Sequence, residues 1–286
     1  MPQISIIVPC YNSAAFIGRT LTALIPEIIN DTDAELLLVD NNSTDNTLSL
    51  LTAATTKYPA SLRVLQATKS QGVNVARNYG ARHATGSILL FTDHDDAVSP
   101  GWLSAFRKAF ADGAQIAAGP YSELTGTGEL IHEISEPELH FWDIPYGLGS
   151  NSGITKTGFE KIGGFEESWQ GGGDDADFFW RAHFAGMPLT FVPGARITHH
   201  MRDDDKATFK QFCGYGRAAV RLYAKFRELG MPRSSTLRAV AAWPLALAEL
   251  GASYLTPKVD RRRALSRCGV RLGRLAESAR QRVLYL

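Results

Sequence analysis

The sequence A-T-G-S-I-L-L-F-T-D-H-D-D, from Ala84 to Asp96, joins an apolar run to three carboxylates. The segment Ser87–Thr92 has four consecutive apolar residues at its centre, without the alternation of a strand that has one wet face. This pattern predicts a strand covered on both faces, as in a parallel sheet. Acidic residues follow it directly, and ligands bind open α/β sheets at the carboxyl ends of their strands.

Short apolar runs alternate with helix-length segments through the first hundred residues. Strands are expected at Ile4–Val8, Glu35–Val39 and Leu62–Leu65 as well as 87–92, and helices at Ala14–Ile29, Asp45–Thr56 and Val73–His83. Such alternation predicts the α/β class, with a mostly parallel sheet flanked by helices. The polar ends of the first, second and fourth strands are therefore expected at one edge of the sheet.

The remainder of the chain is less regular. A helix is expected at Trp102–Ala111 and a strand at Gln115–Gly119, whereas Ser122–Tyr146 has no clear period. Regular patterns return at Phe159–Gly164, Asp175–Ala185, Leu189–Val192 and Ile197–His200. From about residue 206 the pattern predicts a mostly helical and basic extension.

The composition describes a globular chain with an uneven charge distribution. With 286 residues and 44% hydrophobic content, the chain can bury a sizeable core, which excludes global disorder. Residues 1–200 carry 12 basic and 22 acidic side chains, a net charge of −10, and residues 201–286 carry 18 and 7, a net charge of +11. The basic tail points to an anionic partner, either a membrane surface or nucleic acid.

The cysteines and the apolar stretches indicate a cytoplasmic protein. Cys10, Cys213 and Cys268 lie far apart, so neither a disulfide framework nor a thiolate zinc site is expected. The N-terminus shows no signal-peptide pattern. The longest uncharged apolar stretch, Ala239–Ala248, contains Pro244 and is shorter than the roughly 20 residues that a membrane span needs.

The acidic turn after the fourth strand indicates a metal site. Carboxylates at Asp93, Asp95 and Asp96 repel one another unless a cation offsets their charge. Oxygen ligands from Asp93 and Asp95 would leave most of a Mg²⁺ or Mn²⁺ shell open for diphosphate oxygens. The alternative is an exposed turn in which Asp96 caps the following helix.

Polar residues also follow the first two strands. Asp40 lies at the last position of its strand and faces the crevice, where a base or ribose would need an acceptor. Asp45 is the natural N-cap of the next helix. Pro9-Cys10-Tyr11-Asn12 forms a similar polar end to the first strand, although both segments are also compatible with ordinary turn chemistry.

A second acidic group follows the glycine run 171–173. Asp174 and Asp175 stand at the start of an expected helix, where the dipole keeps a carboxylate ionised, so either can serve as a cap or as a general base. Three consecutive glycines favour close approach of a substrate, or movement.

Histidines and cations complete the candidate set. His199 and His200 follow a strand, and strand alternation allows only one of them to face a metal; surface or packing roles are the alternative. Lys69 and Arg77 lie upstream of the acidic turn and are candidates for contact with phosphate, for pairing with Asp40, or for a structural salt bridge.

Seven segments and a closing histidine stand in a fixed order along the chain. They are S-I-I-V-P-C-Y-N (5–12), V-D-N-N-S-T-D (39–45), G-V-N-V-A-R-N-Y-G (72–80), A-T-G-S-I-L-L-F-T-D-H-D-D (84–96), G-S-N-S-G-I (149–154), G-G-F (163–165), G-D-D-A-D-F-F-W-R (173–181) and His199. In this order they resemble a family 2 glycosyltransferase with the GT-A fold, over roughly residues 3–203. The resemblance implies a Rossmann-like sheet that binds a nucleotide sugar. It also implies a catalytic domain 1–205, with a nucleotide-sugar-binding half (1–100) and an acceptor-binding half (101–205), followed by the helical extension 206–286.

The resemblance also implies roles for individual residues. Asp40 binds the nucleobase, Asp93-x-Asp95 is the D-x-D motif with Asp95 the direct metal ligand, Asp175 is the catalytic base and His199 is a further ligand. The donor-contacting set is Pro9, Tyr11, Asn12, Asp40, Asn42, Gly72, Arg77, Asp93, His94 and Asp95. Asp174 stands where the family has Glu, so either acid can be the base, and the Asn pair 41–42 replaces the commoner Asp-Gly.

The reaction implied is inverting, metal-dependent transfer of a sugar from a nucleoside diphosphate, UDP or GDP, to a hydroxyl of a glycan or lipid-linked saccharide. Mn²⁺ or Mg²⁺ would neutralise the leaving diphosphate while Asp175 deprotonates the acceptor. The main alternative is a catalytically silent module that binds sugar nucleotides. A phosphatase with an aspartate nucleophile would carry D-x-D after the first strand, and a nucleotidyltransferase would need a glycine-rich loop there.

The basic tail predicts peripheral attachment to the inner face of a membrane. Apolar residues fall near one helical face and seven arginines surround it, as in an interfacial helix. The apolar set is Leu265, Cys268, Leu272, Leu275, Ala279 and Leu286. Trp243 and Tyr254 flank a second apolar segment, as interface-anchoring aromatics do. The alternative is a helical layer packed on the body, and nucleic acid is a poorer partner because it would leave the apolar face unused.

Overall fold

The computed structural model describes residues 3–58, 62–125, 128–169, 171–200 and 205–286. They form two compact units. The first consists of Met1–Leu139, Ile144–Ser168 and Phe178–Met201, and the second of His140–Asp143, Trp169–Asp177 and Arg202–Leu286. The short segments 140–143 and 169–177 thus group with the C-terminal helices, whereas a single division at 205 was expected. Helix α6 (Asp174–Phe184) contributes its first turn to the second unit.

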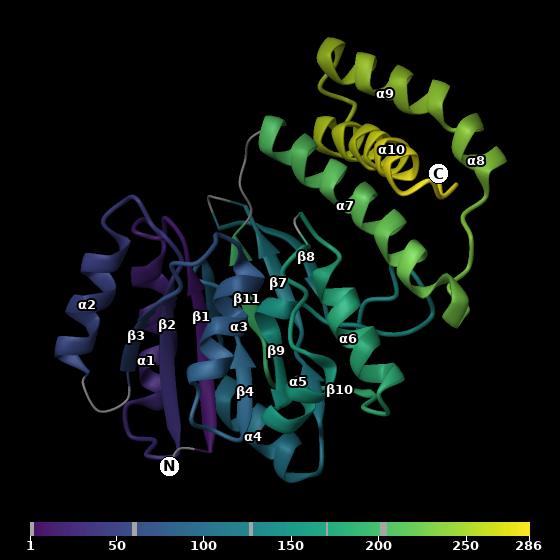
Figure 1. Ribbon diagram of the computed structural model, residues 1–286. Helices are drawn as coiled ribbons and strands as arrows, with labels where there is room; N and C mark the ends of the chain where they lie inside the picture. The colour runs from purple at the N-terminus through teal and green to yellow at the C-terminus, as the bar shows by residue number, and fades with distance from the viewer. Residues whose placement is uncertain (1–2, 59–61, 126–127, 170, 201–204) are drawn as a thin grey trace. The chain divides into compact units, whose positions relative to one another are not determined.

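The first unit is built on a seven-stranded sheet with the order β10-β6-β9-β4-β1-β2-β3 (Figure 1). Its strands are β1 (Ile4–Cys10), β2 (Ala34–Asp40), β3 (Leu62–Gln66), β4 (Ile88–Phe91), β6 (Ile116–Ala118), β9 (Ser152–Thr155) and β10 (Leu189–Phe191). Strand β1 pairs in parallel with β2 and β4, β2 with β3, and β6 with β10. Only β9 runs antiparallel, between β4 and β6. The mostly parallel α/β sheet is confirmed.

Helices cover both faces of this sheet, which explains the continuous apolarity of its strands. They are α1 (Ile17–Ile28), α2 (Thr47–Lys57), α3 (Val73–His83), α4 (Trp102–Ala111) and α5 (Lys156–Ile162). Ile4, Ile6 and Val8 of β1 share one apolar core with residues of α1, α2 and α4. Ile7 faces the other side and meets α3, where a Cβ on Gly80 would lie 2.5 Å from its Cγ2 atom.

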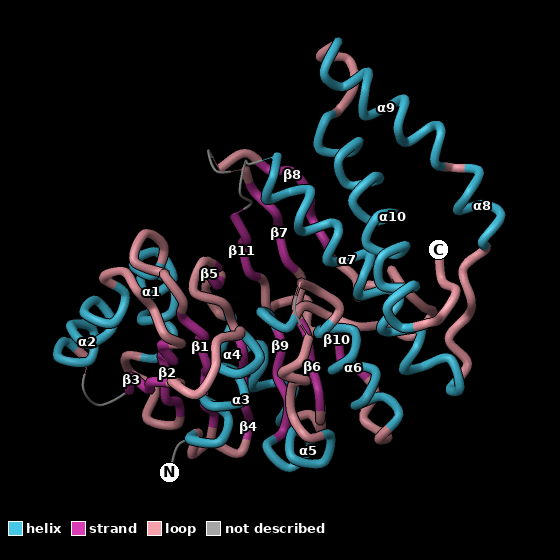
Figure 2. The backbone as a smooth tube through the Cα atoms, turned by 45° about the horizontal axis from the view of Figure 1, so that its top comes forward, coloured by secondary structure: helices cyan, strands magenta, loops and turns pink. Residues whose placement is uncertain are grey.

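A four-stranded sheet with the order β5-β11-β7-β8 completes the first unit. Its strands are β5 (Asp96–Val98), β7 (Tyr121–Leu124), β8 (Leu130–Ile134) and β11 (Ile197–His200), and a short 3₁₀ helix, η1, spans Gly149–Asn151. Figure 2 shows β7, β8 and β11 side by side. The segment 122–146, which has no clear period in the sequence, contains most of β7 and all of β8. Leu130 and Ile131 of β8 are both exposed, so its apolar residues do not alternate as in a half-buried strand.

Helix ends differ from the expected ones where local capping decides them. The helix expected at Ala14–Ile29 begins at Ile17, and the N-cap of α2 is Asn46 rather than Asp45. Asp45 still accepts a hydrogen bond from the backbone N–H of Thr47, at 3.0 Å. The regular pattern at 159–164 belongs to α5, which begins at Lys156 because the Thr155 hydroxyl caps it.

A buried carboxylate ties the strands together at the amino edge of the main sheet. Glu35 of β2 accepts hydrogen bonds from the hydroxyls of Ser5 (2.7 Å) and Thr85 (2.8 Å) and from the backbone N–H of Thr85 (2.6 Å). Its second oxygen pairs with Arg63 at 2.9 Å. Burial alone would raise the pKa of Glu35, but these hydrogen bonds outweigh burial and lower it.

The second unit is helical, as predicted for the residues after about 206. It contains α7 (Asp205–Phe226), α8 (Thr236–Ala241), α9 (Trp243–Leu255) and α10 (Arg261–Gln281), with a 3₁₀ turn, η2, at Arg227–Leu229. Helices α7 and α10 pack closely through glycine: a Cβ on Gly216 would lie 2.1 Å from the carbonyl oxygen of Val270. Within the described residues, every helix is too short or too polar to cross a lipid bilayer.

Candidate active site

The ends of β1 and β2 form one edge of the main sheet, and their loops are joined by hydrogen bonds. The Asn12 side-chain oxygen accepts from the backbone N–H of Thr44 at 2.8 Å. The Ser13 N–H donates to the Thr47 hydroxyl at 2.6 Å, and the Ala14 N–H to a carboxylate oxygen of Asp45 at 3.2 Å. These contacts hold the two loops that carry the predicted donor-binding residues.

Asn41 anchors the next loop, residues 67–72. The sequence did not indicate this structural role for Asn41. Its amide nitrogen donates to the carbonyl oxygens of Ala67 and Ser70, both at 2.7 Å, and its oxygen accepts from the N–H of Gly72 at 2.7 Å. An aspartate cannot donate these bonds, which explains the amide here. The neighbouring Asn42 has a φ of 62°, a conformation that favours glycine and that Asn tolerates, so both departures from the family pattern have a local cause.

Asp40, the last residue of β2, is buried at this edge opposite Cys10 of β1. Among the described residues its Oδ1 atom has no hydrogen-bond partner. A buried carboxylate oxygen without a donor is costly, so this atom is suited to accept a hydrogen bond from a ligand.

Asp93 and Arg77 form an ion pair, with the Nη2 atom of Arg77 2.9 Å from Oδ1 of Asp93. The guanidinium lies 5.1 Å from the ring centroid of Phe165 and donates to the Asn74 side-chain oxygen at 3.3 Å. Of the roles left open for Arg77, the structure shows a salt bridge, and it is made with the acidic turn.

Helix α1 holds the backbone of the acidic turn. The Thr20 hydroxyl donates to the carbonyl oxygens of His94 (2.7 Å) and Asp96 (2.8 Å), and Arg19 donates to that of Asp95 at 3.1 Å. The His94 ring lies 3.1 Å from the carbonyl oxygen of Pro9. These contacts fix the direction in which the carboxylates of the turn point.

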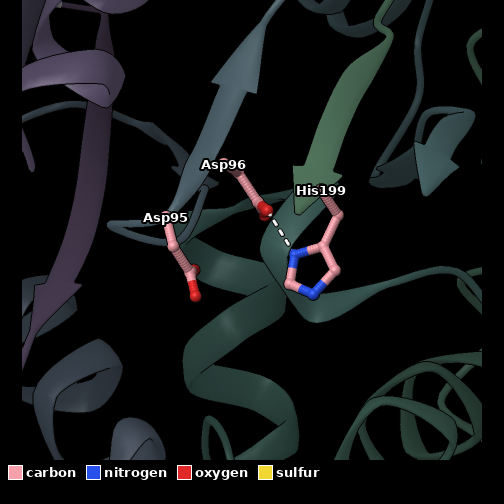
Figure 3. A group of neighbouring side chains, drawn as sticks. All are labelled: Asp95, Asp96 and His199. Carbon is pink, nitrogen blue, oxygen red and sulfur yellow. Dashed lines mark hydrogen bonds and ion pairs between the residues drawn. The ribbon is translucent and has the colours of Figure 1, made fainter. Parts of the chain in front are cut away.

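The structure brings Asp95, Asp96 and His199 together. One potential ligand atom from each lies within 4.8 Å of the others. Figure 3 shows the imidazole of His199 facing the carboxylate of Asp96, with Asp95 beside them. Asp96 and His199 are register partners of the antiparallel strands β5 and β11, and Nδ1 of His199 lies 2.6 Å from Oδ1 of Asp96. Of the two neighbouring histidines, it is thus His199 that lies in this cluster.

Asp96 was missed as a site residue. The alternative that it caps the following helix does not hold, because it lies in β5 and the N-cap of α4 is Gly101. Asp96 is fully buried, and its Oδ2 atom has no hydrogen-bond partner among the described residues. Only its position next to Asp95 signalled it, since the pairing of β5 with β11 joins residues that are 103 positions apart.

The charges of this cluster shift one another's ionisation. Burial raises the pKa of Asp96 to about 6, against the lowering effect of the His199 hydrogen bond. Burial alone would lower the pKa of His199, but the hydrogen bond and negative charge of Asp96, together with Asp95 and Asp93, raise it to about 9. The group thus attracts positive charge, and its oxygen and nitrogen donors fit a divalent cation.

Asp174 and Asp175 lie in the first turn of α6, in the second unit. The preceding glycines are explained by α7: Gly171, Gly172 and Gly173 have φ values of 83°, 106° and 79°. A Cβ on Gly172 would lie 2.5 Å from the Tyr215 ring. The glycines were expected to allow a substrate to approach the backbone closely, or to allow movement. The structure shows that they allow close approach of helix α7.

A buried ion pair holds the same turn. Asp177 is fully buried, and its Oδ1 atom lies 2.5 Å from Nζ of Lys225 on α7. The first turn of α6 and helix α7 are therefore joined both by backbone packing and by charge.

The chain was compared with known proteins after this geometry had been established. Residues 5–163 match the family model for glycosyl transferase family 2, and residues 131–203 match that for the N-terminal domain of galactosyltransferase.

Curated relatives are glycosyltransferases. A validoxylamine A glucosyltransferase of Streptomyces hygroscopicus subsp. jinggangensis is 27% identical over 235 residues, covering 66% of this chain and 53% of that protein. Glycosyltransferase AglE of Haloferax volcanii is 28% identical over 235 residues, covering 77% and 74%. The chain spans 50–53% of the length of the two validoxylamine A glucosyltransferases it matches.

Solved structures share the fold. The mannosyltransferase PcManGT from Pyrobaculum calidifontis, in complex with GDP-Man and Mn²⁺, superposes with a TM-score of 0.66 at 19% identity, over 96% of this chain and 87% of that one. TarS from S. aureus, in complex with UDP, gives 0.56 at 18% identity, over 100% and 93%. The predicted GT-A fold is confirmed, and with more than half of its length matched by the family model, this chain belongs to glycosyl transferase family 2.

Proposed function

We propose that the protein transfers a sugar from a nucleoside diphosphate to an acceptor hydroxyl, with a divalent cation and with inversion at the anomeric carbon. The observation that carries this proposal is the cluster of Asp95, Asp96 and His199, together with Asp40 at the carboxyl end of β2, whose Oδ1 atom has no partner among the described residues. A nucleotide sugar carries a ligand group for each of these two places. Its nucleoside has N–H and O–H donors for Asp40, and its negatively charged diphosphate can bind a cation held by the cluster.

Asp40 accepts a hydrogen bond from the base or ribose in this proposal. Asn41 holds the loop 67–72 beside it, and Asn12 holds the neighbouring loops. The remaining predicted donor contacts, Tyr11 and Asn42 among them, stay predictions.

Asp95 and His199 are the proposed direct metal ligands. Because Asp96 accepts from Nδ1 of His199, it fixes the ring so that the other nitrogen, Nε2, is available for ligation. Asp93 stays a predicted ligand, with its charge balanced by Arg77. A bound Mn²⁺ or Mg²⁺ would stabilise the charge that develops on the departing diphosphate.

Asp175 is the proposed general base, with Asp174 as the alternative. A carboxylate in the first turn of a helix stays ionised, as a base must before it takes the acceptor's proton. Attack by the deprotonated hydroxyl on the face opposite the leaving diphosphate inverts the anomeric centre.

The names of similar proteins guide the choice of substrates. They include a validoxylamine A glucosyltransferase and a poly(ribitol-phosphate) beta-glucosyltransferase, and the structural neighbours contain GDP-Man or UDP. We propose a UDP- or GDP-linked hexose as donor and a saccharide, polyol or lipid-linked saccharide as acceptor. Peripheral membrane attachment stays a prediction that is independent of this chemistry.

The test begins with calorimetric titration of UDP and GDP with and without Mn²⁺. We expect tight binding of one nucleotide only with the metal, and loss of most of the metal-dependent affinity in Asp95→Ala. Unchanged affinity in that variant would contradict the metal assignment. Asp112→Ala, an exposed carboxylate on α4's C-terminal side, is the control.

Turnover separates an enzyme from a silent binding module. We expect donor hydrolysis or transfer by the wild type, and an Asp175→Asn variant that binds donor normally without turnover. A larger loss in Asp174→Asn would exchange the roles of the two acids. Binding by the wild type without turnover, across a panel of acceptors, would favour the silent module. The anomeric configuration of the product, measured by NMR, tests inversion.

A further inference from the structure

Helix α9 presents an uncharged face to the outside of the second unit. Its single charged residue, Glu249, forms an ion pair with Arg267 of α10. Its Ala246 and Ser253 are buried, and the Cys268 thiol of α10 donates to the carbonyl oxygen of Ala246 at 3.3 Å. The only charged residue of α9 therefore faces α10, and its outer face is uncharged. A helix on a water-exposed surface has the opposite arrangement, with its charged residues facing outward.

The outward side of α8 and α9 is an exposed apolar stripe. Its members recur at helical spacing, and Ala242, with helical dihedral angles, is the single residue between the two helices. The stripe consists of Leu237, Val240, Ala241, Pro244, Leu245, Ala248 and Leu255. Leu237 is 85% and Leu255 88% exposed, and Val240 and Leu245 are each more than half exposed.

Cations stand at the edges and ends of this stripe. Arg238 lies on α8, Lys258 follows α9, and Arg263 lies in the first turn of α10, all exposed. None of the three forms an ion pair with any residue that the structure describes. Residues 201–286 together carry a net charge of +11.

We propose that this stripe docks on an anionic lipid surface, with the outer side chains of α8 and α9 in the headgroup region and the flanking cations on lipid phosphates. A lipid surface takes up both features at once. In a second copy of the chain, residues 201–286 would bring their net charge of +11 against the same charge here, and nucleic acid would leave the leucines in water. The proposal does not depend on glycosyl transfer.

The proposed lipid-binding surface lies on α8 and α9, whereas the sequence pattern predicted the apolar face of the helix that is now α10. On α10, Leu265 and Cys268 are buried, so the predicted apolar face is partly used in packing. Leu272 and Leu275 of α10 remain partly exposed. Exposed leucines of α9 and of α10 can therefore be replaced in the same way, and the α10 variant serves as the control for the α9 variant.

The experiment is flotation of the full-length protein with vesicles of phosphatidylcholine, with and without 30% phosphatidylglycerol. We expect recovery with the anionic vesicles only, and at least a tenfold loss of vesicle affinity in Leu245→Gln/Leu255→Gln. Leu272→Gln/Leu275→Gln, with the same chemical change on α10, should bind like the wild type. Arg238→Gln/Lys258→Gln should weaken binding to anionic vesicles, most strongly at low salt.

Several results would overturn the proposal. They are equal recovery with neutral and anionic vesicles, loss of binding in the α10 variant but not in the α9 variant, or a wild-type dimer in sedimentation that the α9 variant abolishes. Circular dichroism must show the same helicity in both leucine variants. Donor hydrolysis measured without vesicles is expected to be unchanged, so failure of docking and failure of the enzymatic proposal are distinguishable.

Discussion

Strand β2 carries a buried carboxylate near each end, and the two differ in how many hydrogen-bond partners the protein gives them. Glu35, at the amino edge of the sheet, is bonded to Ser5, Thr85 and Arg63. Asp40, five residues on at the carboxyl edge, retains an oxygen with no partner among the described residues. Asp96, on β5 of the four-stranded sheet, also has an oxygen with no partner among the described residues.

The difference separates stability from function within one sheet. A buried carboxylate that is fully hydrogen-bonded contributes to folding, whereas one with an unused oxygen costs free energy until a ligand supplies a donor or a positive charge. At Asp40 the carboxyl edge of this sheet therefore carries an oxygen that a ligand can satisfy, whereas Glu35 at the amino edge is fully hydrogen-bonded by the protein itself.

The largest effect is expected for Asp96→Asn. The amide keeps the shape but loses the charge that orients His199, so we expect kcat/KM to fall by about 100-fold at saturating Mn²⁺. The melting temperature should change little, because the substitution removes a buried charge but also its ion pair with His199. Steady-state kinetics and thermal unfolding measure the two. A stability loss that matches the activity loss would place Asp96 with Glu35 instead.

Asp40→Asn is expected to raise the Kd for the donor nucleotide by about 10-fold, the value of one hydrogen bond to a charged acceptor. Calorimetry with nucleotide and Mn²⁺ measures it. The turnover number at saturating donor should change little, because the protein binds the nucleobase or ribose equally well in the ground state and in the transition state. An unchanged Kd would remove Asp40 from the donor site.

Glu35→Gln is expected to lower the free energy of unfolding by about 2 kcal/mol at pH 7, without changing kcat per folded molecule. Because folding lowers the pKa of Glu35, its contribution is present above the unfolded-state pKa and is lost as pH falls through the folded-state value. The difference between wild type and variant should thus narrow below about pH 4.3. Urea unfolding between pH 3 and 7 measures this. A constant difference would show that packing, not charge, is responsible.

The smallest effect is expected for Lys225→Met, which extends the comparison to the second unit. Asp177 loses an ion pair to a lysine side chain that is 36% exposed, so we expect a loss of about 1 kcal/mol in the free energy of unfolding. Lys225→Arg should retain most of it. A fall in kcat larger than tenfold, with unchanged stability and rescue by Lys225→Arg, would instead make Lys225 a positioning residue for the acids of α6.

The alternation of strands and helices in the first hundred residues, and the mostly parallel sheet that they form, could be read from local patterns. Apolar runs at 4–8, 35–39 and 87–92 predicted strands buried on both faces, and acidic residues follow the second and third of these runs. Chain direction alone fixes which end of a parallel strand such residues occupy. Helix α3 was predicted at its observed bounds, Val73–His83.

Contacts between distant segments could not be read in this way. The pairing of β5 with β11 joins Asp96 to His199, the packing of α7 explains the glycines before α6, and the contact of α9 with α10 leaves an apolar stripe outward. A sequence pattern specifies which residue types stand at which spacing along one element. Which faces meet, and hence which buried groups remain without a partner, depends on side chains brought together from far apart in the chain, and no local period encodes that.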